Sequence, residues 1–181
     1  MSRPFALFSL LVLVTASCSS PARPTSALLL PAPGAGYHLS SASGPLTQDA
    51  LSVATALPSD TMAAYLRAAG FRSASERVWT SAHDGFVTDA MVEVSDASAA
   101  ARLVDVAGKT LPGPATSPFT LGVGNGRGFV QTSDVHGQTM FCVIGFFSAG
   151  PRAFVLTRCT PYPQDTATLT RLSKEQLARA T

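Results

Sequence analysis

The stretch FCVIGFFSAGPRAFVLTRC, residues 141–159, decides the fold, because it holds two apolar strands around a tight turn. Alternation and the many aromatic and β-branched residues predict strands over Thr139–Phe147 and Ala153–Cys159. Gly150-Pro151 lies in the middle of the five residues between them and marks the turn. The two strands are therefore expected to form an antiparallel hairpin in which the numbers of paired residues add up to 301.

This register brings two of the three cysteines together. The numbers of Cys142 and Cys159 add up to 301, so the two residues are expected directly opposite each other, at a separation that a disulfide tolerates. The usual arrangement of a redox-active pair, C-x-x-C, does not occur in the sequence. We predict a structural disulfide, which the chain-entropy model values at about 3 kcal/mol for a loop of this size.

Both faces of the hairpin are apolar, and one layer of helices cannot cover both. One face carries Cys142, Ile144, Phe146 and Val155. The other face carries Phe141, Val143, Phe147, Phe154 and Leu156, which together are the candidate ligand groove. This second face is expected to be core inside a strongly bent sheet, to be covered by the tether or a partner chain, or to hold a lipid or another hydrophobic ligand.

The first seventeen residues, MSRPFALFSLLVLVTAS, have the layout of a bacterial export signal. Arg3 gives a positive start, and small residues precede Cys18. The apolar core between them is about half of the roughly 20 residues that a membrane-spanning helix needs. VTASC resembles a lipobox, although Thr15 stands where Leu, Val or Ile is usual. We predict a lipoprotein signal peptide over residues 1–17 and diacylglyceryl lipidation of Cys18, with simple secretion as the alternative.

These predictions place the chain on the extracytoplasmic face of the bacterial cell membrane, where disulfides persist. Residues 18–43 are expected to form the lipidated start and a flexible tether, followed by one domain over residues 44–181. The part rich in Pro, Ala and Ser, residues 19–36, would reach roughly 60 Å when fully stretched. Leu28-Leu29-Leu30 interrupts its polar character and is a candidate for docking on the domain.

The domain is predicted to be α+β, with a largely antiparallel sheet of about six strands and helices packed on one face. Helices are expected over Thr47–Leu57, from Ser59 or Asp60 to a Schellman stop at Gly70-Phe71, after Ser95 or Asp96, and after Asp165. The strands outside the hairpin are expected over Glu76–Ser81, Phe86–Val94, Phe119–Val123 and Gly128–Ser133, with turns at Asp84-Gly85, Asn125-Gly126 and His136-Gly137. In Phe86–Val94 an apolar row occupies one face, and Asp89 and Glu93 lie on the other.

The sequence carries no pattern that predicts a catalytic, metal or nucleotide site. Its 13 basic residues are nearly balanced by 11 acidic ones, which argues against a nucleic-acid partner. GVGNGRG, residues 122–128, precedes a strand and not a helix, so a turn is favoured over a phosphate-binding loop. The histidines lack metal-ligand spacing, no G-x-S-x-G motif occurs, and the single tryptophan is expected in the core: His38, His83, His136 and Trp79. We therefore expect neither cofactor nor metal.

Four passages support a resemblance to a known group: the lipobox TASC, YLRAAGFRSASERVWTS, VEVSDASAAARL and RAFVLTRCTPYPQDTATLTRL. In the order of its elements, the part from about Leu46 to Ala180 is similar to actinobacterial lipoproteins whose soluble domain has the Mog1/PsbP-like fold, the LpqN-type group among them. Most proteins of that group have no assigned biochemical role. The resemblance implies a non-catalytic module of the cell envelope and transfers no catalytic residues.

We therefore expect a lipid-anchored lipoprotein whose extracytoplasmic domain binds a partner or acts as a sensor-like module, and which is not an enzyme. Two alternatives remain open. The first is a carrier that holds a hydrophobic envelope lipid in an apolar groove. The second is a cell-envelope hydrolase, which needs a serine or cysteine within hydrogen-bond reach of a histidine. The expected partners are the membrane, through the diacylglyceryl anchor, and a protein or hydrophobic ligand of unknown identity.

Overall fold

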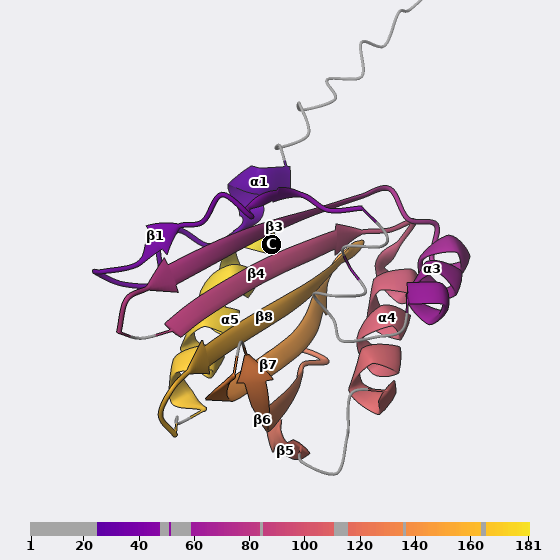
Figure 1. Ribbon diagram of the computed structural model, residues 1–181. Helices are drawn as coiled ribbons and strands as arrows, with labels where there is room; N and C mark the ends of the chain where they lie inside the picture. Colours follow the sequence, from indigo (N-terminus) through magenta and orange to yellow (C-terminus); the bar gives the residue numbers. More distant parts are fainter. Residues whose placement is uncertain are drawn as a thin grey trace, which may run out of the picture.

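The computed structural model describes residues 25–47, 51, 59–83, 85–110, 116–135, 137–163 and 166–181 (Figure 1). These residues form an antiparallel sheet with helices, so the predicted α+β class is confirmed. The strand order is β1-β3-β4-β8-β7-β6-β5, and β2 also pairs with β3. Six strands have five residues or more, in agreement with the predicted number. Two more arise because the chain before α3 adds the very short β1 and β2 to the outer edge of β3.

The elements have the following bounds. The strands are β1 His38–Leu39, β2 Gly44–Pro45, β3 Ser73–Ser81, β4 Gly85–Glu93, β5 Thr116–Thr120, β6 Arg127–Val135, β7 Gln138–Ala149 and β8 Arg152–Thr160. The helices are α1 Thr25–Leu28, α3 Ser59–Ala68, α4 Ala97–Thr110 and α5 Ala167–Ala180. Of the helix predicted over Thr47–Leu57, the structure describes a backbone hydrogen bond of 3.1 Å from Leu51 N–H to the Thr47 carbonyl, and the remainder lies outside the described residues.

The predicted register of the β7–β8 hairpin is confirmed, and this hairpin lies in the middle of the sheet. Gly150 forms the turn with a positive φ of 55°, a conformation that glycine adopts without a steric penalty. Cys142 faces Cys159 with their Cα atoms 4.1 Å apart, and the structure joins the two sulfurs in a disulfide. The bond crosslinks the two central strands.

Helices cover both faces of the sheet, which corrects the expectation that they pack on one face. In Figure 1, α5 (yellow) passes behind β4 and β8, whereas α3 and α4 lie to the right of the strands. On the face of α4, small residues of the helix allow close approach to the sheet, and the cluster includes Ala99, Ala100, Val104, Ala107, Ile144, Phe146 and Val155. On the face of α5 the cluster includes Leu28, Leu29, Leu30, Val143, Phe147, Phe154, Leu156, Leu169 and Leu172. The physical reason is the hairpin itself, because both of its faces must leave water.

Two local predictions have clear outcomes. Helix α3 ends in the predicted Schellman motif: Phe71 N–H donates to the Leu66 carbonyl at 3.0 Å, and Gly70 N–H donates to Arg67 at 3.1 Å. The strand predicted over Phe119–Val123 is wrong in its position, since β5 ends at Thr120. The chain turns back directly after that residue, and Leu121 and Val123 fold into the core on the α5 face.

The disulfide generates a first prediction. Replacing both Cys142 and Cys159 by alanine is expected to lower the free energy of unfolding by about 3 kcal/mol, because the bond closes a loop with a sequence separation of 17. Urea unfolding of the oxidised protein and of the double variant measures the difference. Reductant should destabilise the wild-type protein by a similar amount and leave the variant unchanged, whereas an effect of reductant on the variant would contradict this explanation.

Candidate functional site

Three leucines that precede the predicted domain lie in its core. Leu28, Leu29 and Leu30, which we call the strap, are 4%, 1% and 2% exposed and belong to the cluster on the α5 face. Figure 1 shows α1, which ends at Leu28, next to β3 and to the C-terminal end of α5. The strap thus covers part of the second apolar face of the sheet, as its apolar character suggested.

Three polar side chains hold the backbone of the strap, and we call them the clamp. Leu30 N–H donates a hydrogen bond of 2.6 Å to Oδ2 of Asp89 on β4. Nη1 of Arg77 on β3 donates to the carbonyls of Leu29 and Leu30, at 3.0 and 2.8 Å. Nε2 of Gln176 on α5 donates to the Leu28 carbonyl at 2.7 Å. The clamp therefore recognises main-chain groups, while the leucine side chains fill the core.

Asp89 is the unusual member of the clamp, because its side chain is completely buried. Burial raises the pKa of Asp89 to about 7, against the opposing effects of the Leu30 hydrogen bond and of the positive charges of Arg77 and Arg179; the negative charge of Glu76 raises it further. Desolvation dominates because a carboxylate loses its water shell when the strap and α5 cover it. The group is poised to change its charge near neutral pH.

The site also contains buried polar atoms without a hydrogen-bond partner among the described residues. They are Oδ1 of Asp89, Oε1 of Gln176 and Oγ of Ser173, which lies one helical turn before Gln176. Each such atom costs about 1–3 kcal/mol, and native proteins keep few of them. These unpaired atoms therefore reduce the stability of the polar centre under the strap.

Asp89 lies on the face of β4 opposite the row of Ala90 and Val92, as predicted, but its burial was not predicted. The structure buries that face of β4 together with Val87 and Met91, the neighbours of Asp89 on the same side. This apolar flank was the available signal: an aspartate between two apolar residues on one strand face indicates burial. Its hydrogen-bond partner Leu30 could not be found in the same way, because Leu30 lies 59 residues before it.

The candidate ligand groove is occupied by the protein itself. Four of its residues, Val143, Phe147, Phe154 and Leu156, are at most 1% exposed and pack with the strap and with α5. The rings of Phe147 and Phe154 stack with their centroids 5.1 Å apart. The fifth residue, Phe141, is half-buried beyond this cluster. In the structure this face is core, which was one of the readings left open.

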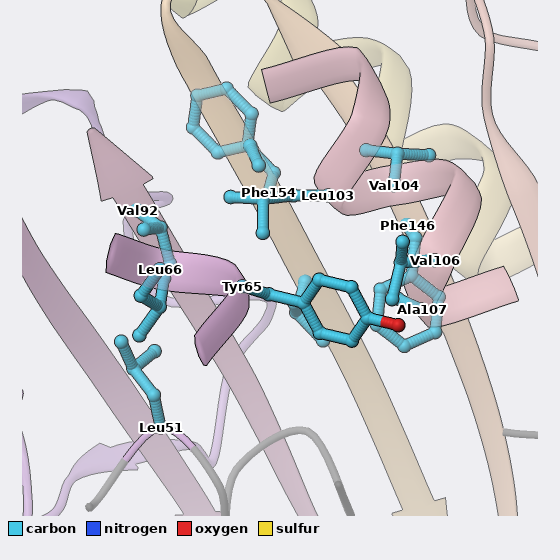
Figure 2. A pocket seen from close by; sticks show the side chains of 12 residues that line it. Leu51, Tyr65, Leu66, Val92, Leu103, Val104, Val106, Ala107, Phe146 and Phe154 are labelled. Carbon is cyan, nitrogen blue, oxygen red and sulfur yellow. The ribbon is translucent and has the colours of Figure 1, made fainter. Parts of the chain in front are cut away.

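A small apolar cavity lies on the opposite face, beneath α3 (Figure 2). Its lining comes from both helices and the sheet: Leu51, Tyr65, Leu66, Val92, Leu103, Val104, Val106, Ala107, Phe146, Ala153, Phe154 and Val155. Its volume is about 30 Å³. An engineered protein cavity that binds benzene measures about 150 Å³, so this space is too small for even one aromatic ring. It is a packing defect of methyl size and no site for an acyl chain.

The remaining candidates from the sequence lie apart from the clamp. His38 and His83 are exposed, His136 lies outside the described residues, and Trp79 is half-buried against the α5-face cluster. Among the described residues no group of three or more His, Cys, Asp or Glu side chains could hold a metal ion. None of the helices in that part of the chain has the length and apolar content that crossing a bilayer requires.

Comparison with known proteins gives a likeness of fold. No family model and no curated protein sequence matches the chain. The structure is similar to the crystal structure of the extracellular domain of PknH from Mycobacterium tuberculosis, with a TM-score of 0.63 over 86% of this chain and 94% of that domain. The sequence identity is 12%, so the likeness establishes a shared fold and nothing finer.

The clamp predicts a specific cost for one side chain. Replacing Gln176 by alanine is expected to lower the free energy of unfolding by about 1–3 kcal/mol, because the buried Leu28 carbonyl then loses its donor. Urea unfolding measures the loss. Lys174→Ala, at an exposed position of the same helix, is the matched control and should change stability by less than about 0.5 kcal/mol. Equal effects of the two variants would contradict a structural role of the Gln176 amide.

The cavity predicts a stabilising substitution. Val104→Ile adds one methyl group beside the cavity and is expected to raise the free energy of unfolding by up to about 0.8 kcal/mol. The same change at Val87, which is 1% exposed in the filled core on the other face, should be destabilising by about 1–3 kcal/mol through overpacking. Thermal and urea unfolding of the two variants check the contrast, and a destabilised Val104→Ile variant would show that the space is closed in solution.

Proposed function

We propose that the chain is a lipid-anchored lipoprotein of the bacterial cell envelope whose extracytoplasmic domain acts by binding, in a sensor-like manner, and not by catalysis. The observation that carries the proposal is a disulfide-crosslinked domain with the fold of a protein domain that is itself extracellular. The sequence before the domain supplies the anchor: an apolar export signal ends in TASC, and Cys18 is the remaining cysteine once the other two have paired.

The disulfide and the fold each support a location outside the cytoplasm. Disulfides persist in oxidising compartments outside the cytoplasm, and the Cys142–Cys159 bond lies in the centre of the sheet, where exchange with solvent thiols is hindered. The PknH domain, which has a similar fold, is also extracellular. We further infer kinship with the LpqN-type lipoproteins of the Mog1/PsbP-like fold, on the strength of the four quoted passages and their element order.

A binding role is supported by how the polar side chains are used. In the clamp, the side chains of Asp89, Arg77 and Gln176 hold the backbone of the chain's own strap. Such an arrangement recognises an apolar peptide segment. A lipid carrier gains no support from the candidate groove, which is filled, or from a cavity of about 30 Å³.

The anchor can be tested in a bacterial host that processes lipoproteins. The wild-type protein is expected to incorporate labelled palmitate and to sediment with the membrane fraction. Cys18→Ala should lose the label and either appear in the soluble fraction or accumulate unprocessed, because the thioether cannot form. Ser19→Ala is the matched control and should behave as the wild type. Processed Cys18→Ala protein that stays on the membrane would refute the lipid anchor.

A further inference from the structure

We propose that the strap is a reversible latch that opens when Asp89 loses its proton, so that the domain responds to the acidity of its surroundings. The closed latch is the arrangement in the structure, with Leu28–Leu30 on the sheet and their backbone in the clamp. In the open latch the strap leaves the sheet and water reaches Asp89. This inference deepens the proposed function by naming the stimulus, and only its effect on the anchor distance rests on that function.

The strand pairing of the sheet does not involve the strap. β3 pairs with β4 along their full length, and β4 pairs with β8 from Phe86↔Cys159 to Glu93↔Arg152. The outer edge of β3 is covered separately by β1 and β2, and by a hydrogen bond of 2.8 Å from Ser40 N–H to the Val78 carbonyl. Departure of the strap therefore breaks no strand pair of the described sheet; it breaks the hydrogen bonds of the clamp and exposes the apolar side chains that the three leucines cover.

The groups around Asp89 determine how strongly its protonation affects the docking of the strap. From β3, Arg77 lies directly opposite Asp89 in the ladder, and Glu76 lies next to Arg77. From α5, Arg179 contributes a positive charge, and Ser173 and Gln176 are neutral. From β8, Leu156 pairs with Asp89, and Arg158 follows two residues further on the same face. The strap itself contributes one N–H group, so removal of the strap replaces mostly apolar surface by water around this carboxyl group.

The sign of the effect follows from linkage. With the latch closed, burial raises the pKa of Asp89 to about 7, while a carboxyl group in water has its ordinary pKa of 3.8. The closed form therefore holds the proton more tightly than the open form. The equilibrium constant for closing the latch is highest below about pH 4. It falls by up to tenfold per pH unit between pH 4 and pH 7, and it is constant above pH 7.

The latch changes how far the domain reaches from an anchor at Cys18. Leu28 is ten Cα-to-Cα steps after Cys18, so a closed latch confines the strap within about 36 Å of the anchor. With the latch open, the first attachment to the sheet is β1 at His38, and the twenty steps from Cys18 to His38 span at most about 70 Å. Deprotonation of Asp89 would therefore roughly double the maximum distance between Cys18 and the first residue attached to the sheet.

Hydrogen exchange of the processed, full-length mature protein in detergent micelles tests the latch. After correction for the intrinsic exchange rate, the protection of the Leu30 amide should fall at least about tenfold from pH 5 to pH 7. At each pH this amide should exchange faster than amides in the centre of β7, because the strap opens without unfolding the sheet. In Asp89→Asn the pH dependence should disappear, and in the control Glu175→Gln, an exposed carboxylate on α5, it should persist.

Three results would overturn the proposal: protection of Leu30 that does not change with pH, equal protection of Leu30 and the centre of β7, or unchanged pH dependence in Asp89→Asn. If Asp89→Asn does not fold, the first two measurements on the wild-type protein still decide. These measurements can be made on the mature chain whether or not Cys18 carries a lipid. A failure of palmitate labelling would thus refute the anchor and leave the latch standing, and a pH-independent strap would refute the latch and leave the anchor standing.

Discussion

The rest of the structure depends on the burial of both faces of one hairpin. β7 and β8 are apolar on each side and lie in the middle of the sheet, so neither side can be left to solvent. The small side chains of α4 bring one helix close to the first face. On the second face α5 covers one part of the area, and the three leucines of the strap cover a further part. The strap is therefore core, although it precedes the regular part of the domain.

Burying a short segment that is not paired as a strand creates a second constraint. Its N–H and C=O groups lose water, and the strand ladders of the sheet offer them no partners. Asp89, Arg77 and Gln176 supply these partners from three different elements. The solution has a cost, because it places a carboxyl group in an apolar setting and leaves some oxygen atoms without a partner in the described structure. A core that stays closed would avoid such a polar centre, whereas the proposed latch needs a centre that favours reversible docking of the strap.

This arrangement would connect the proposed anchor with the domain. Under the proposed function, the segment that comes from the membrane is the same segment that closes the core, so the covalent link and the packing interaction would share a few residues. A domain whose fold is similar to that of the extracellular domain of PknH would thereby be combined with a tether whose free length depends on how the domain packs. The proposed binding role and the proposed latch both follow from this shared segment, and they remain separable by experiment.

Local patterns in the sequence determined the hairpin, its register, the meeting of Cys142 with Cys159 and the end of α3, because each depends on residues close together along the chain. The two-sided apolar hairpin also showed that a second cover was needed. Which segment provides that cover, and which side chains hold it, was decided by the tertiary structure. The clamp joins residues up to 148 positions apart, and the burial of Asp89 arises from packing between elements that no local pattern connects.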